Sequence, residues 1–229
     1  MVDTQVSPEE LLGPLDEVER KHAPERLWVR GDMSLLTRGA RVSVVGSRRA
    51  SEIGFRRATK LARLLVDAGV VVVSGLAEGI DWAAHTSAIR SGGRTVAVLG
   101  TPLAKAFPAK HRDLQEEIGR DHLLVSQFAP GTNTFPSHFP MRNRTMALLS
   151  DATVIVEAGP KSGTVHQGWE ALRLGRQLYV LESLAEQRFA WVQDLQAHGA
   201  QVLADSNRSL FLEGLPQESR LERFEQAPF

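Results

Sequence analysis

The sequence predicts a doubly wound α/β fold of the Rossmann-like class, with a mostly parallel sheet and helices on both faces. Short apolar runs alternate with helical stretches along most of the chain. Most of these runs are continuous β-branched or apolar segments, the composition of a strand that is covered on both faces. Their connections are too helical for hairpins, which indicates parallel strands joined by right-handed crossovers.

The predicted elements follow one another in regular order. Phe55, Ala58, Ala62 and Leu65 recur at three- and four-residue spacing, which predicts an amphipathic helix that Ser51 can cap. Further helices are expected at 81–90, 140–149, 164–174 and 185–198, in addition to 52–68. Strands are expected at 42–45, 70–73, 95–99, 123–125, 153–156, 177–181 and 201–203.

We expect one core with two flanking segments. Residues 1–40 read as a helix and an extended lead-in, in which residues 27–29 can add an edge strand. Residues 41–204 form the Rossmann-like core, and residues 205–229 form a polar, peripheral tail. A chain of 229 residues is long enough for one large α/β domain.

Composition excludes several kinds of site. The chain has no cysteine, so disulfides, thiolate metal sites and a cysteine nucleophile are excluded. The acidic N-terminus lacks a signal-peptide pattern, and no apolar run approaches the roughly 20 residues of a membrane helix. We therefore expect a cytoplasmic protein without membrane contact, and we expect no metal site and no cofactor.

Positive charge is concentrated locally although the net charge is zero. Residues 41–63 hold seven basic residues against one acid. A local basic face of this kind attracts a phosphate chain. The alternative is a solvated helix surface with scattered arginines.

The loops after the strands carry the candidate binding residues, because ligands of open parallel sheets bind at the carboxyl ends of the strands. Gly46 permits close backbone approach, Ser47 follows it, and Arg48 and Arg49 supply forked donors at a helix start, where backbone N–H groups favour anions. The alternative is a plain strand–helix turn. The loop lacks a GxGxxG pattern, so we expect no tightly held NAD.

Two further loops resemble phosphate cradles. Ser74 and Gly75 precede a helix on which Asp81 and His85 can face one another. We interpret that pair as a helix cap and a packed, hydrogen-bonded histidine, and a metal or acid–base role is the alternative. The second cradle opens the helix expected at 164–174, where amide and hydroxyl groups can converge on an anion or simply cap the helix. It consists of Lys161, Ser162, Gly163 and Thr164.

A long loop at 127–139 leads into a basic helix start. Long loops in compact domains are usually functional. Phe135, His138 and Phe139 are candidate stacking platforms. Aromatic rings beside cations suit single-stranded nucleic acid, in which bases stack and phosphates need charge. The cations are Arg142 and Arg144, with Asn143 between them. The alternative is that the rings fill the core and the arginines form ion pairs.

Taken together, these motifs resemble the DprA/Smf family of DNA-processing proteins over about residues 25–182. The matching segments are LWVRGDMSLL (27–36), VSVVGSRRAS (42–51), VVSGLAEGIDWAAH (72–85), TVAVLG (95–100), FP (107–108), FPMRNR (139–144), VEAGPKSGT (156–164) and LGRQLYVL (174–181). The resemblance implies an extended Rossmann fold and a homodimeric protein that binds single-stranded DNA, loads RecA in natural transformation and is not an enzyme. It places the DNA backbone at Gly46, Ser47 and Arg48, with Arg142, Asn143 and Arg144 lining the same pocket and Ser162, Gly163 and Thr164 at its far edge.

The sequence departs from the family pattern in places. The family usually has Ser-Gly-Ser-Leu-x-Thr-Ala near 162–168, whereas this chain has Ser-Gly-Thr-Val-His-Gln-Gly. The loop at 101–106 lacks the usual Gly-rich opening. We expect a minimal member without the family's flanking domains, and the role in transformation, recombination or defence stays open.

Two alternatives remain from the sequence. The fold also resembles nucleoside-monophosphate phosphoribohydrolases of the lysine-decarboxylase-like group, which use a glutamate where this chain has Gln167. An amide cannot act as a general base. The other alternative is a nucleotide-binding sensor without turnover, because a nucleotide phosphate and a DNA phosphate suit the same loops.

Overall fold

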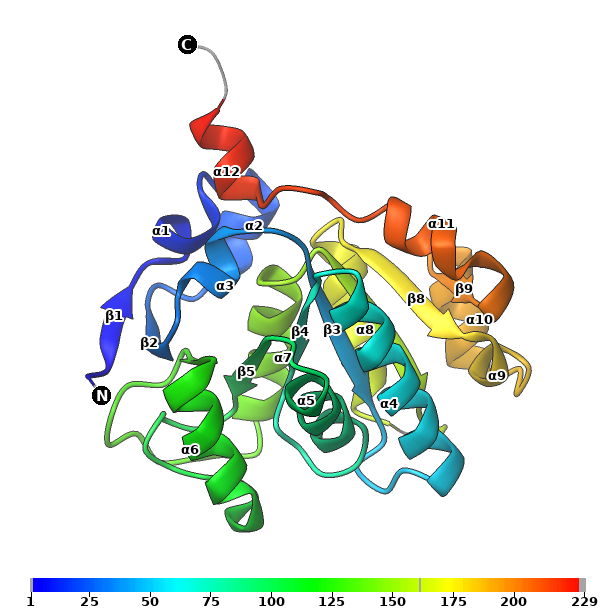
Figure 1. The fold of residues 1–229 in the computed structure, drawn as a ribbon, viewed down its shortest axis with the longest axis horizontal. Coiled ribbons are helices and arrows are strands. Elements are labelled where there is room, and N and C mark those ends of the chain that lie inside the picture. The colour runs from blue at the N-terminus through cyan, green and yellow to red at the C-terminus, as the bar shows by residue number, and fades with distance from the viewer. Residues whose placement is uncertain (1, 161, 227–229) are drawn as a thin grey trace.

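The protein is built around a twisted nine-stranded sheet (Figure 1). The computed structural model describes residues 2–160 and 162–226. The strands lie in the order β1-β2-β6-β5-β4-β3-β7-β8-β9, and β3 to β9 are mutually parallel. Their bounds are β1 Thr4–Val6, β2 Leu27–Gly31, β3 Arg41–Gly46, β4 Val71–Ser74, β5 Thr95–Leu99, β6 Leu123–Ser126, β7 Ala152–Glu157, β8 Gln177–Leu181 and β9 Gln201–Leu203. The predicted fold class is confirmed.

The sheet has one topological switch point, between β3 and β7. From β3 the chain winds outward through β4 and β5 to β6, then returns to the other side of β3 with β7 and winds outward again. The connections after β3 and β7 therefore leave in opposite directions. A crevice opens between them at the carboxyl ends of the strands.

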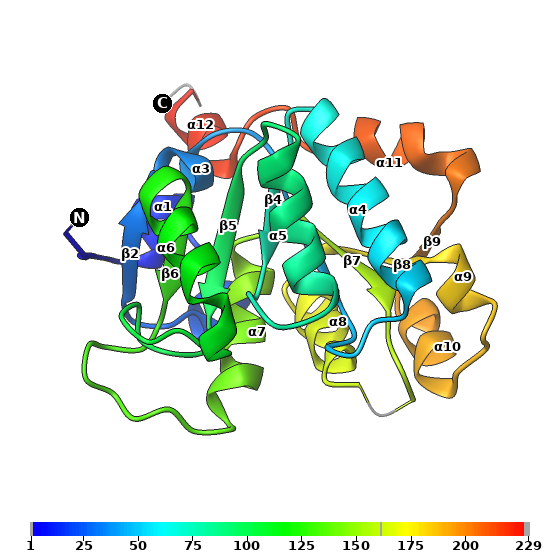
Figure 2. The same cartoon turned by 60° about the horizontal axis from the view of Figure 1, so that its bottom comes forward.

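Helices cover both faces of the sheet, as Figure 2 shows. Successive side chains of a strand face opposite layers, so Val44 packs beneath α4 and α5 while Val45 packs in the opposite layer. One face carries α4 Glu52–Asp67, α5 Ile80–Arg90, α6 Arg112–Asp121 and α11 Arg208–Glu213; the other carries α7 His138–Leu148, α8 Thr164–Arg173 and α10 Ala190–Ala197, together with α1 Pro8–Leu12 and α3 Ser34–Thr37. Within the described residues, no helix has the length and apolar character needed to cross a membrane.

Several elements differ from the sequence-based expectations. The helix expected at 185–198 is divided into α9 Glu182–Ala185 and α10, because Arg188 adopts a left-handed φ of 52° that a continuous helix does not allow. The lead-in strand β2 exists but is not an edge strand, since β1 pairs with its outer side in antiparallel fashion. Helix α6 was not expected.

The segment after β9 packs into the core at one point. Phe211 of α11 is buried and meets Tyr179 of β8 edge to face, with ring centroids 4.8 Å apart. Beyond it, α12 Arg220–Glu225 returns to the N-terminal helices, where Arg220 and Arg176 both pair with the buried Glu19 of α2 Glu17–His22. These ion pairs connect the two ends of the described chain.

Candidate nucleic-acid interface

A cleft of about 840 Å³ lies at the switch point. It is bounded by the loop after β3, the start of α7 and the connection from β7 into α8. In Figure 2 the loop before α7 and the connection into α8 lie at the same lower edge of the sheet. Most of the predicted binding residues line the cleft: Gly46, Ser47, Arg48, Arg49, Phe139, Arg142, Asn143, Ser162, Gly163 and Thr164.

The loop after β3 is folded tightly against its neighbours. A Cβ atom on Gly46 would lie 2.5 Å from Ile80 Cγ1 and 2.7 Å from the Glu157 carbonyl oxygen, so only glycine fits there. Ser47 N–H donates to that carbonyl at 2.7 Å, and Ser47 Oγ accepts from Arg49 N–H at 3.1 Å. The loop thereby presents the exposed Arg48 and Arg49 at the cleft.

The start of α4 does not offer the free anion site that the sequence suggested. Ser51 N–H and Oγ–H donate to the two carboxylate oxygens of Glu157, at 2.8 and 2.5 Å. Ser51 Oγ in turn accepts from Gly54 N–H at 3.0 Å and caps the helix as expected. A protein carboxylate therefore already occupies the positive end of α4.

The start of α8 is open by comparison. Gly163, its N-cap residue, is exposed and carries no side-chain cap, and no described atom lies within 4 Å of where its Cβ would stand. Ser162 Oγ accepts from Thr164 N–H at 3.2 Å and donates to Thr164 Oγ1 at 2.9 Å. The ten-residue helix α8 thus directs its positive end into the cleft with two hydroxyl groups beside it. Lys161, the fourth predicted residue of this cradle, lies outside the described residues.

Arg142 lies under the cleft and holds its walls together. It is 4% exposed, and its Nη1 donates to the carbonyl oxygens of Gly75 and Val98, the latter at 2.8 Å. Its Nε donates to Asn143 Oδ1 at 3.0 Å. Burial lowers the pKa of Arg142, and the nearby Asp81 opposes this shift. These bonds tie α7 to the loop after β4 and to strand β5.

Asp81 is buried beside this network and does not cap α5. Its Oδ2 accepts from Gly75 N–H at 3.2 Å and from Ala77 N–H at 3.3 Å, while the N-cap of α5 is Gly79. Burial raises the pKa of Asp81, and the Arg142 charge opposes the shift. The prediction for His85 is confirmed: it is fully buried, with Nδ1 2.7 Å from Thr95 Oγ1. No group of three or more potential metal ligands was found among the described residues.

Aromatic rings extend from the cleft to the surface. The Arg48 guanidinium carbon lies 5.3 Å from the centroid of the Phe139 ring, which fits over Gly100. The Phe107 ring lies 5.1 Å beyond Phe139 and is 46% exposed. Phe107 was absent from the predicted site, although its Phe-Pro pair lies within the family motifs. Of the other two predicted stacking rings, His138 is buried and stacks on Phe128 with ring centroids 3.9 Å apart, which is the core-filling alternative, and Phe135 is exposed but does not line the cleft.

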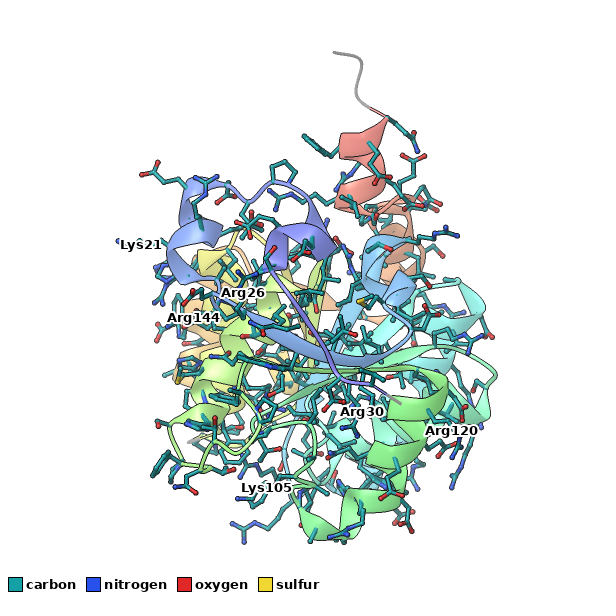
Figure 3. All side chains as sticks on the ribbon, turned by 90° about the vertical axis from the view of Figure 1, so that its left-hand side faces the viewer. Lys21, Arg26, Arg30, Lys105, Arg120 and Arg144 are labelled. Atoms are coloured by element: carbon teal, nitrogen blue, oxygen red, sulfur yellow. The ribbon has the colours of Figure 1, made fainter. Side chains whose placement is uncertain are left out.

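Three further predicted residues, Arg144, Ser74 and Gly75, do not line the cleft. Arg144 forms a two-pronged ion pair with the buried Glu170, at 2.9 and 3.2 Å, and Figure 3 shows it on the flank of the molecule that also carries Lys21. Burial raises the pKa of Glu170, but the Arg144 hydrogen bond and charge outweigh it and hold that pKa below its usual value. Ser74 is buried and donates to the Val44 carbonyl at 2.7 Å, and Gly75 is buried against Arg142. A DNA contact by any of the three stays a prediction.

The basic stretch at 41–63 is divided between several places. Arg48 and Arg49 reach the cleft, and the buried Arg41 pairs with Asp151. The remaining four lie around a separate groove beside α4, which is lined by Arg56, Arg57, Lys60, Arg63 and Arg208 and by the acids Glu52, Asp67, Glu182 and Asp205. The charges of this groove nearly balance, which is the solvated-surface alternative.

Comparisons with known proteins identify the family. A model of the DNA recombination-mediator protein A family matches residues 8–212. The chain is 37% identical over 200 residues to DNA processing protein DprA of Streptococcus pneumoniae, covering 84% of this chain and 70% of that protein. It is 34% identical over 158 residues to DprA of Bacillus subtilis, covering 69% of this chain but only 53%, about half, of that protein.

Solved structures agree with this assignment. A structure of DNA processing protein A from Helicobacter pylori, described for its single-stranded DNA binding mode, matches with a TM-score of 0.76 at 25% identity and covers 93% of this chain and 98% of that one. The resemblance seen in the sequence motifs is thus confirmed over sequence and fold alike. This chain belongs to the DNA recombination-mediator protein A family, the family of DprA and Smf.

Proposed function

We propose that this protein binds single-stranded DNA in the switch-point cleft and acts as a recombination mediator in DNA processing. One observation carries the proposal: the cations Arg48 and Arg49, an open helix start and the Phe139 ring meet in a single cleft, with the Phe107 ring beside Phe139. The Helicobacter pylori relative, which has the same fold, is described as binding single-stranded DNA.

Each part of the cleft suits one part of a nucleic-acid strand. Arg48 and Arg49 supply guanidinium donors, and the start of α8 supplies backbone N–H and hydroxyl donors, so both sides of the cleft match phosphate oxygens. Phe139 and Phe107 offer ring faces next to those donors, where successive bases can stack without regard to sequence. The binding is therefore expected to be salt-dependent and tolerant of sequence.

The first prediction concerns Arg48. Each phosphate contact to a single strand contributes a slope of about −0.7 to log K against log salt concentration. In Arg48→Ala we expect this slope to become shallower by about 0.7 and the affinity for all sequences to fall alike. Binding of a labelled oligo-dT is followed by fluorescence anisotropy between about 50 and 200 mM salt, the range over which such losses are large.

Arg56→Ala is the matched control. Arg56 also carries an exposed guanidinium, but it pairs with Glu52 on α4 and lies outside the cleft. We expect this variant to keep the wild-type slope. An affinity of the wild type that does not depend on salt, or equal slopes for Arg48→Ala and Arg56→Ala, would contradict phosphate binding in the cleft.

We also propose that the site is not catalytic. The related phosphoribohydrolases use a glutamate at the position of Gln167, and this buried amide cannot accept a proton or carry the charge of that glutamate. Incubation with AMP should therefore yield no ribose 5-phosphate. Release of ribose 5-phosphate at a rate that depends on enzyme concentration would assign the cleft to the hydrolase alternative.

A free nucleotide is the second candidate ligand, because the cleft volume of about 840 Å³ falls within the range of small-molecule sites. A thermal-shift series with nucleoside monophosphates distinguishes the two ligands. A nucleotide at a hundredfold excess over its Kd should stabilise the fold by about 2.7 kcal/mol. A shift with nucleotides and none with oligo-dT would favour the sensor.

A homodimer and a contact with RecA complete the proposal. Both rest on membership of a recombination-mediator family. Sedimentation equilibrium of the purified chain tests the dimer, and co-sedimentation of RecA on single-stranded DNA with and without this protein tests the loading role. A monomer at all concentrations, or RecA filaments that form equally fast without the protein, would remove the corresponding part.

A further inference from the structure

The deep end of the cleft contains a polar side chain without a matching partner. Gln167 lies on the first turn of α8, is 1% exposed and lines the cleft. Its Oε1 has no hydrogen-bond partner among the described residues. Its Nε2 is 3.5 Å from Thr153 Oγ1, at the outer limit for a hydrogen bond. Leaving such an atom buried and unpaired costs about 1–3 kcal/mol, which a ligand donor would recover.

The cleft that Gln167 lines also has buried apolar side chains. Val45 and Met146 line the same cleft and are 4% and 1% exposed. A phosphate does not suit this place, because it brings only acceptors to an acceptor and would lose its hydration against methyl and thioether groups. The buried Asp81 carboxylate in the same cleft already interacts with the Arg142 charge and accepts two backbone N–H groups, so it is not free to bind a cationic amine. A flat, neutral heteroaromatic ring with an N–H on its edge fits both the walls and the free oxygen.

The spacing along α8 agrees with a single nucleotide. Gln167 follows Gly163 by four residues, which is about 6 Å along a helix axis. The open helix start and the buried amide therefore lie about one helical turn apart. A phosphate at the rim and a ring at the deep end can belong to the same nucleotide.

We propose that the deep end of the cleft receives one unstacked nucleobase of the bound strand, and that Gln167 Oε1 accepts a hydrogen bond from an N–H on its Watson–Crick edge. This inference rests on the single-stranded DNA binding proposed above. Each of the four bases carries an N–H group on that edge. Gln167 is therefore a positioning contact that anchors a base and tolerates sequence, while the rings at the surface stack its neighbours.

The experiment removes the donor from the base and the acceptor from the protein in turn. Oligo-dT and the same oligonucleotide built from 3-methylthymidine, which lacks the ring N–H, are titrated into the wild type and into Gln167→Met. We expect the wild type to bind the methylated strand about tenfold more weakly, a difference of about 1.4 kcal/mol. Gln167→Met should bind the two strands alike, because it has no acceptor to satisfy.

Two further variants make the outcome unambiguous. Gln193→Met, an exposed glutamine on α10, should keep the full methylation penalty. Gln167→Thr has a shorter side chain that cannot reach the base, so this variant should lose the methylation penalty as Gln167→Met does. It replaces Gln167→Met if that variant fails to fold. An equal methylation penalty in the wild type and both Gln167 variants would overturn the base contact while leaving DNA binding intact. If neither strand binds the wild type, the proposed function itself fails.

Discussion

His85 should make the fold sensitive to acid, because its imidazole is held without charge in the interior. The side chain is fully buried between α5 and the sheet, with Nδ1 2.7 Å from Thr95 Oγ1. Burial, together with the nearby charges of His122, Arg142 and His111, lowers the pKa of His85 to about 3. The folded protein therefore keeps this group neutral at pH values where a free histidine is charged.

The loss of stability at low pH follows from the difference between the pKa of His85 in the folded and unfolded states. In the unfolded chain the pKa of His85 is near its ordinary value of 6.5. As pH falls below 6.5, the unfolded state binds a proton that the folded state cannot bind until about pH 3. The contribution of His85 to the free energy of unfolding is therefore fully present above pH 6.5 and falls by about 1.4 kcal/mol per pH unit below it. At pH 5 the expected loss is about 2 kcal/mol.

Urea unfolding at pH 7 and pH 5, followed by tryptophan fluorescence, measures this loss. His85→Asn is the informative variant, because asparagine does not titrate and can still reach Thr95 Oγ1. We expect the wild type to lose about 2 kcal/mol more than His85→Asn between the two pH values. His198→Asn, which removes an exposed imidazole, should behave as the wild type does. The same loss in wild type and His85→Asn would refute the assignment.

Two further substitutions test the packing around the site and the tail. A Cβ on Gly75 would overlap Arg142 Nη1, so Gly75→Ala should displace that guanidinium. In anisotropy titrations we expect this variant to bind oligo-dT about tenfold more weakly than the wild type. An unchanged affinity would show that DNA binding does not depend on the position of Arg142. Phe211→Ala should lower the free energy of unfolding by about 3–5 kcal/mol, because it removes the ring that packs on Tyr179. Leu210→Ala is the control, since Leu210 is 70% exposed, and it should change the free energy of unfolding little. Equal effects of the two substitutions would show that α11 is not part of the core.

The core of the sheet was predictable because its strands bury both faces. A run such as 70–73 is apolar throughout, and this pattern stays visible without knowledge of the neighbours. Helix α6 lacks such a signal: seven of its ten residues are charged or glutamine, and Gln115 is buried through a bond to the Leu103 carbonyl. Strand β1 has only Val6 buried and is ordered by pairing with β2. Tertiary contacts decide both elements.

The site was predictable in its positions but not in its pairings. Residues such as Arg48 and Thr164 follow strands, and parallel strands bring their carboxyl ends to one edge. Whether a cation is free depends on partners that are far away in the sequence. Arg144 finds Glu170 26 residues later, and Ser51 finds Glu157 106 residues later. No local pattern contains that information.

Glu157 determines which helix start at the cleft is open to an anion. Its carbonyl and carboxylate oxygens fix the loop after β3 and occupy the start of α4, so of the two helix starts at the switch point only that of α8 is open to an anion. A phosphate bound between α8 and Arg48 would stay at the rim, because the Glu157 carboxylate repels it and the buried apolar side chains of Val45 and Met146 disfavour it inside the cleft. The same arrangement that holds phosphates at the rim therefore leaves the deep end of the cleft to an uncharged part of the strand.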